Sequence, residues 1–242
     1  MAINTLKKLI LQSKNIVLFG GAGTSTESNI PDFRSENGLY ALKKYNVSPE
    51  EILSHDYFYK HPDRFYAFLK EYLLLPNVTP HKGHFATVAL ESMGLNTIIT
   101  QNIDGLHQAA GSKNVIELHG SVHRHYCTKC RALYDMAWIL SIQDDIIRCP
   151  LCNSLVKPDV VLYGEPLNQE VMSETVKAIH ESDLLIVAGT SLVVYPAASF
   201  LRYYKGKNLV LINKSETPYD HTASLVIRDS YGDVFDQLIH HL

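Results

Sequence analysis

The fold of this chain is decided by the stretch Gly20-Gly21-Ala22-Gly23-Thr24-Ser25-Thr26-Glu27-Ser28-Asn29-Ile30-Pro31-Asp32-Phe33-Arg34. A short apolar run of strand formers, residues 16–19, comes directly before it. A glycine-rich turn after a strand lets backbone N–H groups approach a phosphate. The pattern lacks the third glycine of the dinucleotide fingerprint, however. The stretch is therefore a candidate nucleotide-binding loop, and a simple tight turn between a strand and a helix is the alternative.

The composition of the chain excludes several classes of protein. The 242 residues are 46% apolar, and 22 Lys and Arg stand against 25 Asp and Glu, so there is no basic surplus for nucleic acid. The longest apolar runs fall far short of the roughly 18 residues that a membrane helix needs. Residues 1–14 contain lysines but no apolar core of a signal peptide. We expect a cytoplasmic protein, acting as a monomer, that binds neither nucleic acid nor membranes.

Alternating strand and helix patterns predict an α/β fold. Apolar runs predict strands over residues 16–19, 96–100, 114–118, 159–163, 184–188 and 209–212. Helical spacing predicts helices around Leu6 and Ile10, over residues 62–75, on the face of Phe85, Val88 and Ala89, over residues 171–179, after Pro196 and after Gly232. Repeated strand–helix units indicate a Rossmann-like parallel sheet with helices on both faces.

Two segments interrupt this alternation and predict a small second domain. Residues 36–81 form an aromatic, proline-punctuated helical insertion, and residues 121–153 carry all four cysteines. The remaining segments, 1–35, 82–120 and 154–242, are expected to form the Rossmann-like domain.

The cysteines are spaced as metal ligands. Cys127-x-x-Cys130 and Cys149-x-x-Cys152 are separated by 18 residues, which matches a four-cysteine zinc ribbon. Four thiolates leave no open coordination position, so the zinc is expected to be structural. Redox pairs are the alternative.

Polar residues follow two predicted strands, where open α/β sheets bind their ligands. One strand runs into residues 101–107, and the next runs into His119-Gly120. An imidazole at this edge is suited to act as a general base near neutral pH. For His119 we weigh a catalytic role equally against a structural one, whereas for His107 we favour a packing or hydrogen-bonding role over catalysis.

Together these motifs resemble the sirtuin family of NAD-dependent protein-lysine deacylases, and most closely its undifferentiated bacterial class. The resemblance covers essentially the whole chain. It rests on residues 21–34, 100–107, 118–120, 157–165, 189–192 and 212–213 and on the four cysteines.

The resemblance implies an activity and a set of cofactor contacts. It implies that an acyl-lysine oxygen displaces nicotinamide from NAD, that His119 deprotonates the ribose, and that the products are lysine and O-acetyl-ADP-ribose. His119 and Asn102 are the catalytic residues that it implies. The implied cofactor contacts, besides these two, are Gly21, Ala22, Gly23, Thr26, Phe33, Arg34, Gln101, Ile103, Asp104, Gly189, Thr190, Ser191, Asn213, Lys214 and Tyr231.

The resemblance also implies how acylated proteins bind. A substrate peptide is expected to add a strand between the two domains. The implied peptide contacts are Val160, Val161, Tyr163, Gly164, Glu165 and Val193. Family members that remove acidic acyl groups carry a tyrosine and an arginine in the helical insertion. Leu69 and Tyr72 occupy the matching positions here, so we expect acetyl or other neutral acyl groups.

Three residues depart from the family pattern. Asn29 replaces a glycine, Tyr163 a phenylalanine and Lys157 an arginine. Because asparagine tolerates positive φ better than other non-glycine residues, we expect the loop at Asn29 to keep its shape.

Three other functions compete with deacylation. A mono-ADP-ribosyltransferase would use every one of the same site residues, so the sequence separates it poorly. A non-catalytic NAD-binding or zinc-scaffold module would not need His119. A hydride-transferring dehydrogenase is least favoured, because the glycine fingerprint is incomplete and the next strand comes only after the long insertion.

Overall fold

The larger of two sheets has six strands, all parallel, in a computed structural model that describes residues 2–32, 38–39 and 46–241. The strand order is β3-β2-β1-β7-β8-β9, and every neighbouring pair is parallel. The strands are β1 Ile16–Gly20, β2 Leu95–Thr100, β3 Val115–Glu117, β7 Leu184–Ala188, β8 Asn208–Ile212 and β9 Leu225–Ile227. The predicted parallel sheet is confirmed. The order reverses between β1 and β7, and ligands of open parallel sheets bind at such a switch point.

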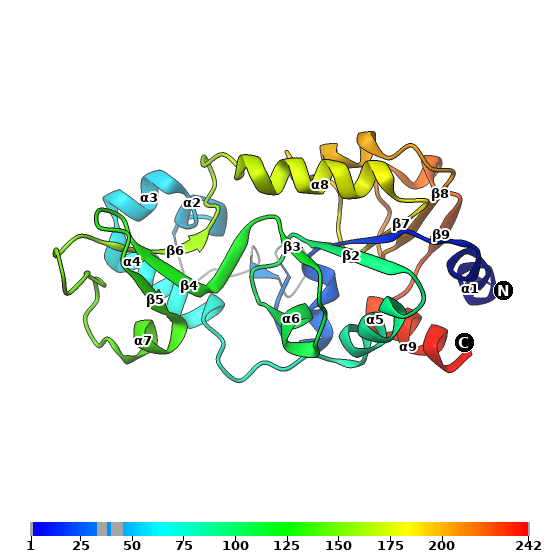
Figure 1. Ribbon diagram of the computed structural model, residues 1–242. Helices are drawn as coiled ribbons and strands as arrows, with labels where there is room; N and C mark the ends of the chain where they lie inside the picture. The colour runs from blue at the N-terminus through cyan, green and yellow to red at the C-terminus, as the bar shows by residue number, and fades with distance from the viewer. Residues whose placement is uncertain (1, 33–37, 40–45, 242) are drawn as a thin grey trace.

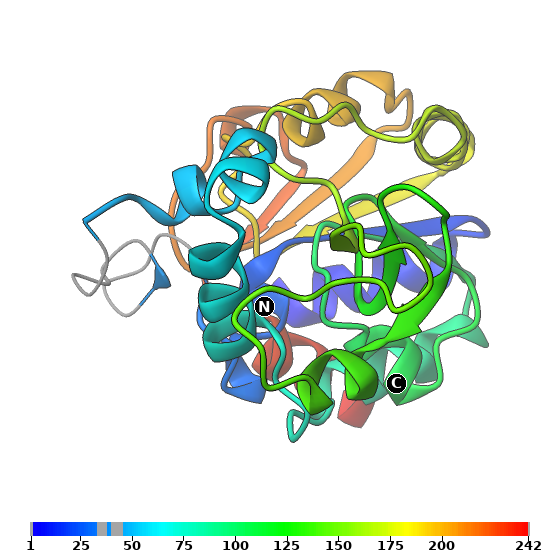
Figure 2. The same cartoon turned by 90° about the vertical axis from the view of Figure 1, so that its left-hand side faces the viewer.

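Helices cover both faces of this sheet (Figures 1 and 2). On one face α1 Ala2–Gln12, α5 Lys82–Glu91 and α9 Tyr231–His241 share a core with the sheet. On the other, α8 Gln169–Glu181 and the 3₁₀ segment η5 Ala197–Tyr203 pack together. The strand β7 is buried along its whole length, as a strand covered on both sides must be.

The second sheet belongs to a smaller domain at one end of the molecule (Figure 1). Its antiparallel strands are β5 Leu133–Asp135, β4 Gly120–Cys127 and β6 Val156–Val160, in that order. The helices beside it are α2 Pro49–Ile52, α3 His55–Lys60, α4 Pro62–Phe68, the π-helical segment η4 Leu69–Leu73 and α7 Met136–Ser141.

One core joins the helical insertion to the cysteine-bearing segment. Phe58, Phe65 and Tyr66 are buried in a cluster that also holds Cys127 and Val156. The hydroxyl of Tyr66 donates to the carbonyls of Ile147 and Val156, 3.1 and 2.9 Å away. Two segments that are distant in sequence therefore share one core.

One predicted strand is placed in the wrong sheet. The expected strand over residues 159–163 is β6 Val156–Val160, and it pairs with β4 in the antiparallel sheet. The residues after Val160 leave the strand because the chain turns at residues 162–165, where Gly164 has φ +87°. The predicted domain boundary at residue 154 therefore falls before the last strand of the small domain. The edge strand β9 was not predicted.

The helix predicted from Phe85, Val88 and Ala89 is α5, but these residues do not form its buried face. Phe85 is 54% exposed, whereas His84, Thr87 and Leu90 are buried. The helix turns its small side toward α9, because a Cβ on Gly83 would lie 2.8 Å from Gly232 Cα. The close approach of the two helices thus outweighs the burial of one aromatic ring.

Two further helix predictions hold with changes in form. The helix expected over residues 62–75 is α4 continued by the π-helical η4, and Phe65, Phe68 and Leu69 on it are buried. The helix expected after Pro196 is the 3₁₀ segment η5. Among the described residues, no helix is long and apolar enough to cross a membrane.

Candidate functional site

The glycine-rich loop packs its backbone against the end of β7. The amides of Gly21 and Gly23 donate to the carbonyls of Ala188 and Gly189, at 3.1 and 2.8 Å. A Cβ on Gly23 would lie 2.7 Å from Gly189 Cα, and one on Gly21 would lie 2.7 Å from Thr190 Cβ. These glycines are required because no side chain fits between the two loops. The loop then forms two 3₁₀ turns, η1 Ala22–Thr24 and η2 Thr26–Ser28, instead of beginning a long helix.

Asn29 ends the loop in the left-handed conformation. Its φ is 61° and its ψ is 25°, and its amide donates to Thr26 O at 3.1 Å. The prediction that asparagine serves here at positive φ is confirmed. Phe33 and Arg34, which the sequence analysis also assigned to the cofactor, lie outside the described residues.

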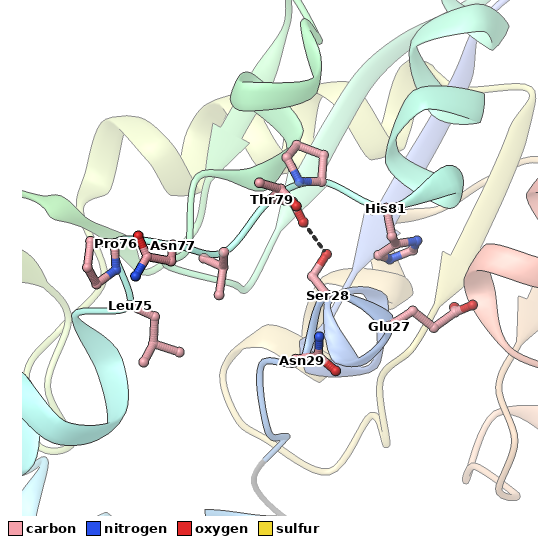
Figure 3. A pocket seen from close by; sticks show the side chains of 10 residues that line it. Glu27, Ser28, Asn29, Leu75, Pro76, Asn77, Thr79 and His81 are labelled. Carbon is pink, nitrogen blue, oxygen red and sulfur yellow. Dashed lines mark hydrogen bonds between the residues drawn. The ribbon is translucent and has the colours of Figure 1, made fainter.

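A cavity of about 360 Å³ lies beside this loop (Figure 3). Glu27, Ser28 and Asn29 line one side, and residues 75–81 line the other. The Ser28 hydroxyl donates to Thr79 O across it, 2.7 Å away. His81 donates through Nε2 to Thr24 O at 2.8 Å, because a carbonyl oxygen only accepts. The segment that leads into α5 therefore holds the loop at two points.

The loop after β2 is bonded to the glycine-rich loop. Asn102 Nδ2 donates to Thr24 Oγ1 and Ser25 Oγ, at 3.1 and 2.9 Å. Ser25 Oγ in turn donates to Asp104 Oδ2 at 2.6 Å. Gln101 Nε2 reaches Gly20 O at 3.2 Å. The structure thus brings together the predicted residues Asn102 and Asp104 through a serine that has no assigned role in the sequence analysis.

Ser25 is the residue that the sequence analysis missed. Its side chain is 1% exposed and links Asn102 to Asp104. The sequence shows that Ser25 lies in the small polar run after the glycines. It does not show the hydrogen bond to Asp104, which is 79 residues further along the chain.

Asp104 carries a half-buried carboxyl group at the domain boundary. Burial raises its pKa, and the bonds that it accepts from Ser25 and the Leu106 amide act in the opposite direction. Its backbone carbonyl accepts from His123 Nε2 on β4, 2.8 Å away. The next residue, Gly105, has no room for a side chain, since a Cβ would lie 2.8 Å from the His123 ring. The small domain therefore contacts the site loop directly.

The hydrogen bonding of His119 fixes its neutral tautomer. Nδ1 lies 2.8 Å from Gln101 O, and because a carbonyl only accepts, Nδ1 carries the proton. In the neutral ring Nε2 then has a free lone pair. Burial lowers the pKa of His119, and the bond to Gln101 partly offsets this. The ring is therefore neutral at pH 7 and can accept a proton at Nε2.

The side chain of Tyr231, a predicted cofactor contact at the start of α9, is buried in the core. It is 2% exposed and lies between α5 and α9. Its hydroxyl bonds to Gly83 O and Thr87, and its ring lies beside His84 and His107. Burial lowers the pKa of these two histidines to about 2 and about 4, so both are neutral. The packing role expected for His107 is confirmed, and Tyr231 joins the same cluster.

The remaining predicted cofactor residues lie at the same edge of the sheet. Gly189, Thr190 and Ser191 follow β7, and Asn213 and Lys214 follow β8. Thr190 Oγ1 accepts from Gln101 Nε2 at 3.3 Å. Gly189 has φ +59°, and a Cβ there would lie 2.5 Å from Thr24 N. The two glycine turns therefore approach each other with no side chain between their backbones, which leaves space beside them for a ligand at this edge of the sheet.

The predicted peptide residues lie on both sides of the domain boundary. The Val161 amide donates to the carbonyl of His119 at 3.0 Å. Tyr163 bonds through its backbone to Leu53 and His55 of the helical insertion. Val193, 48% exposed, follows the β7 loop of the large domain. The segment from Val160 to Glu165 thus links the candidate base to the small domain.

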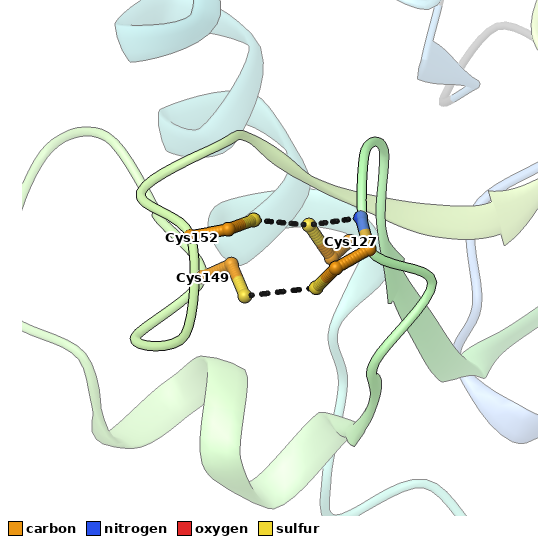
Figure 4. A group of neighbouring side chains, drawn as sticks. Cys127, Cys149 and Cys152 are labelled. Carbon is orange, nitrogen blue, oxygen red and sulfur yellow. Dashed lines mark hydrogen bonds between the residues drawn. The ribbon is translucent and has the colours of Figure 1, made fainter.

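The four cysteines form one cluster (Figure 4). All four Sγ atoms lie within 4.8 Å of one another, with Cys127 and Cys152 3.3 Å apart and Cys130 and Cys149 3.5 Å apart. Tetrahedral zinc with bonds of about 2.3 Å places sulfurs roughly 3.8 Å apart. The donor set therefore fits a structural zinc ion.

Both cysteine pairs are carried by the same backbone turn. In each pair, the carbonyl of the first cysteine accepts a hydrogen bond from the amide four residues later. The Arg131 amide donates to Cys127 O at 3.1 Å, and the Asn153 amide donates to Cys149 O at 2.8 Å. These two residues have φ 62° and 59°. Two copies of one strained turn that face each other are consistent with a metal that holds both.

Comparisons with known proteins agree with this geometry. The model of the Sir2 family matches residues 21–196. A protein of Clostridium acetobutylicum named NAD-dependent protein deacetylase is 53% identical over 239 residues, covering 98% of both chains. Its namesake in Clostridium tetani is 54% identical over 239 residues, covering 98% of this chain and 97% of that one.

Solved structures show the same fold. A Sir2 protein in complex with a peptide and NAD⁺ has a TM-score of 0.88 and 38% identity, covering 100% of this chain and 98% of that one. Another, bound to a propionylated peptide, has a TM-score of 0.89 and 36% identity, with the same coverage.

We predict that the purified protein contains one zinc ion per chain and that Cys149→Ser loses it. Removal of the metal by a chelator should unfold the small domain, because the thiolates hold its turns together. Tyr134→Phe is the milder variant, since it removes only a hydroxyl 3.1 Å from Cys149 Sγ. It should keep the zinc but release it faster. Metal analysis and thermal unfolding measure both effects, and a metal-free, fully folded wild type contradicts the prediction.

A second prediction concerns Asn29. Asn29→Gly should leave turnover within a few-fold of wild type, because glycine adopts φ 61° without strain. Asn29→Val should lower the melting temperature, since a left-handed conformation costs a non-glycine residue about 1–2 kcal/mol. Loss of activity in the glycine variant would show that the amide side chain has a role of its own.

Proposed function

This chain belongs to the Sir2 family and is an NAD-dependent protein deacetylase, and we propose that it removes acetyl and other neutral acyl groups from lysine with His119 as the general base. The observation that carries this assignment is the bond from His119 Nδ1 to Gln101 O. It holds the ring at the carboxyl edge of the sheet with an unprotonated Nε2.

NAD, when bound, supplies a glycosidic bond to nicotinamide whose cleavage lets ADP-ribose take up the acyl group. The chain's own contribution is binding and proton transfer. Ala22, Thr26, Thr190 and Ser191, in the glycine-rich loop and in the turn after β7, are proposed to contact the phosphates. The amides of Gly21, Gly23 and Gly189 are already bonded to the carbonyls of Ala188, Gly189 and Ile212 and hold the two turns in place. His119 Nε2 accepts the proton of a ribose hydroxyl, and such transfers typically contribute about 10²–10⁴-fold to a rate.

The bonds between Asn102, Ser25 and Asp104 organise the other half of the site. Asn102 is proposed to orient the ribose or a water molecule, with its amide fixed by two hydroxyls. Ile103 and Asp104 are proposed to hold the nicotinamide carboxamide. Because Ser25 and the Leu106 amide each bond to Asp104, the orientation of its carboxyl group is fixed before any ligand binds.

The substrate proposal rests on two positions of the helical insertion. Leu69 and Tyr72 stand where family members that remove acidic acyl groups carry a tyrosine and an arginine, and neither side chain offers a positive charge to an acidic acyl group. The peptide is proposed to add as a strand between Val160–Glu165 and the loop at Val193. We further propose that the enzyme is a cytoplasmic monomer whose partners are acylated proteins.

The direct test is His119→Ala with an acetylated peptide and NAD. Turnover should fall by about 10²-fold or more, because proton transfer is lost. His240→Ala, a change at an exposed histidine on α9, serves as the control and should match wild type. Product analysis separates the two candidate activities. NAD consumption without O-acetyl-ADP-ribose would favour ADP-ribosyl transfer and contradict deacylation.

The pH profile provides an independent prediction. A general base works only when deprotonated, so kcat/KM should be flat at high pH and fall about tenfold per unit below the pKa of His119. Burial lowers this pKa from 6.5, so the midpoint of the acid limb should lie below pH 6.5. A midpoint clearly above 6.5 would mean that another group titrates.

A further inference from the structure

An ion pair between a buried lysine and a half-buried glutamate holds the two ends of the proposed peptide segment, Val160 to Glu165. Lys157 on β6 is 3% exposed, and its ammonium lies 2.9 Å from Glu165 Oε2. The same ammonium donates to Val160 O at 2.7 Å. One cation thus contacts both ends of the segment from Val160 to Glu165. A buried charge is costly without a partner, so each member of the pair needs the other.

The ion pair closes a tight turn. The Glu165 amide donates to Leu162 O at 2.9 Å, and the Leu162 amide donates back to Glu165 Oε2 at 2.9 Å. Gly164, the third residue of the turn, has φ +87°, as position i+2 of a type II turn requires. The turn is therefore fixed by its backbone and by a carboxylate that Lys157 holds in place.

This turn is continuous with the catalytic side of the molecule. Val161, which precedes it, donates to the His119 carbonyl, and Tyr163 within it bonds to Leu53 and His55. A shift of the turn would consequently move backbone atoms that the proposed peptide strand must meet. The glycine-rich loop and the β7 loop are separate segments, and none of the bonds of Lys157 or Glu165 described above reaches them.

We propose that Lys157 and Glu165 are positioning residues for the acyl-lysine peptide, holding the turn from Leu162 to Glu165 in its binding shape. The inference rests on the proposed peptide site. It assigns to the pair an effect on peptide affinity and none on NAD affinity. A purely structural ion pair would change stability without this selectivity.

Four variants test the pair. Glu165→Gln keeps the shape and an acceptor for the Leu162 amide but removes the charge. Lys157→Met keeps the aliphatic stem, and the double variant removes both charges together. Lys157→Arg keeps the cation and should stay within about twofold of wild type. The matched control is Asp159→Asn. Asp159 lies on β6, as Lys157 does, and this change removes an exposed ion pair with Arg124 on β4.

The readouts are KM for an acetylated peptide, KM for NAD, and peptide affinity by fluorescence anisotropy. Glu165→Gln and Lys157→Met should each raise peptide KM and Kd about tenfold, within the range in which contacting residues couple. KM for NAD should remain within about twofold. The double variant should resemble the singles, since either change already breaks the pair.

The proposal is overturned if peptide Kd is unchanged in Glu165→Gln, or if both KM values rise together. The anisotropy measurement does not depend on turnover. The two proposals can therefore fail separately. If the variants selectively lose peptide binding while the wild type produces no O-acetyl-ADP-ribose, the role of the ion pair is supported and the deacylase mechanism is refuted.

Discussion

The site depends on one close backbone contact, between the glycine-rich loop after β1 and the turn after β7. Gly21, Gly23 and Gly189 meet where a Cβ on any of them would lie less than 3 Å from the opposite loop. The contact occurs at the switch point of the sheet, where the strand order reverses. It brings the ends of β1 and β7 together. The loops after β2 and β3 then add the polar side chains of Asn102, Asp104 and His119 at the same edge of the sheet.

A series of hydrogen bonds connects the glycine-rich loop to the candidate base, His119. Thr24 and Ser25 of the glycine-rich loop accept from Asn102, and the neighbouring Gln101 carbonyl accepts from His119. Backbone carbonyls and buried hydroxyls change little with pH or ligand, so they hold the catalytic groups in a fixed arrangement. The domain boundary is joined to the same loops through His123 and Val161.

The sequence predicted the parts of the structure that depend on local pattern. Buried strands such as β7 are continuous apolar runs, and the two cysteine pairs have the spacing that zinc requires. The small sheet was missed because β4 alternates with polar residues and because one of its two partners, β6, follows only after the second cysteine pair. The run Val160-Val161-Leu162 resembles a buried strand, but its backbone bonds go to β4, His119 and Glu165. The position of the Tyr231 ring, in the core between α5 and α9, was not predicted. Burial of this kind depends on helix packing that no short motif encodes.

The central claim is that the fold presents His119 as a neutral imidazole with a free Nε2. The most direct measurement is nitrogen-15 NMR of histidine-labelled protein at pH 7, with the His119 signals assigned by comparison with His119→Ala. The structure predicts a protonated Nδ1 and an unprotonated Nε2, because Nδ1 donates to Gln101 O. A protonated Nε2, in either the other tautomer or the imidazolium, would contradict the account.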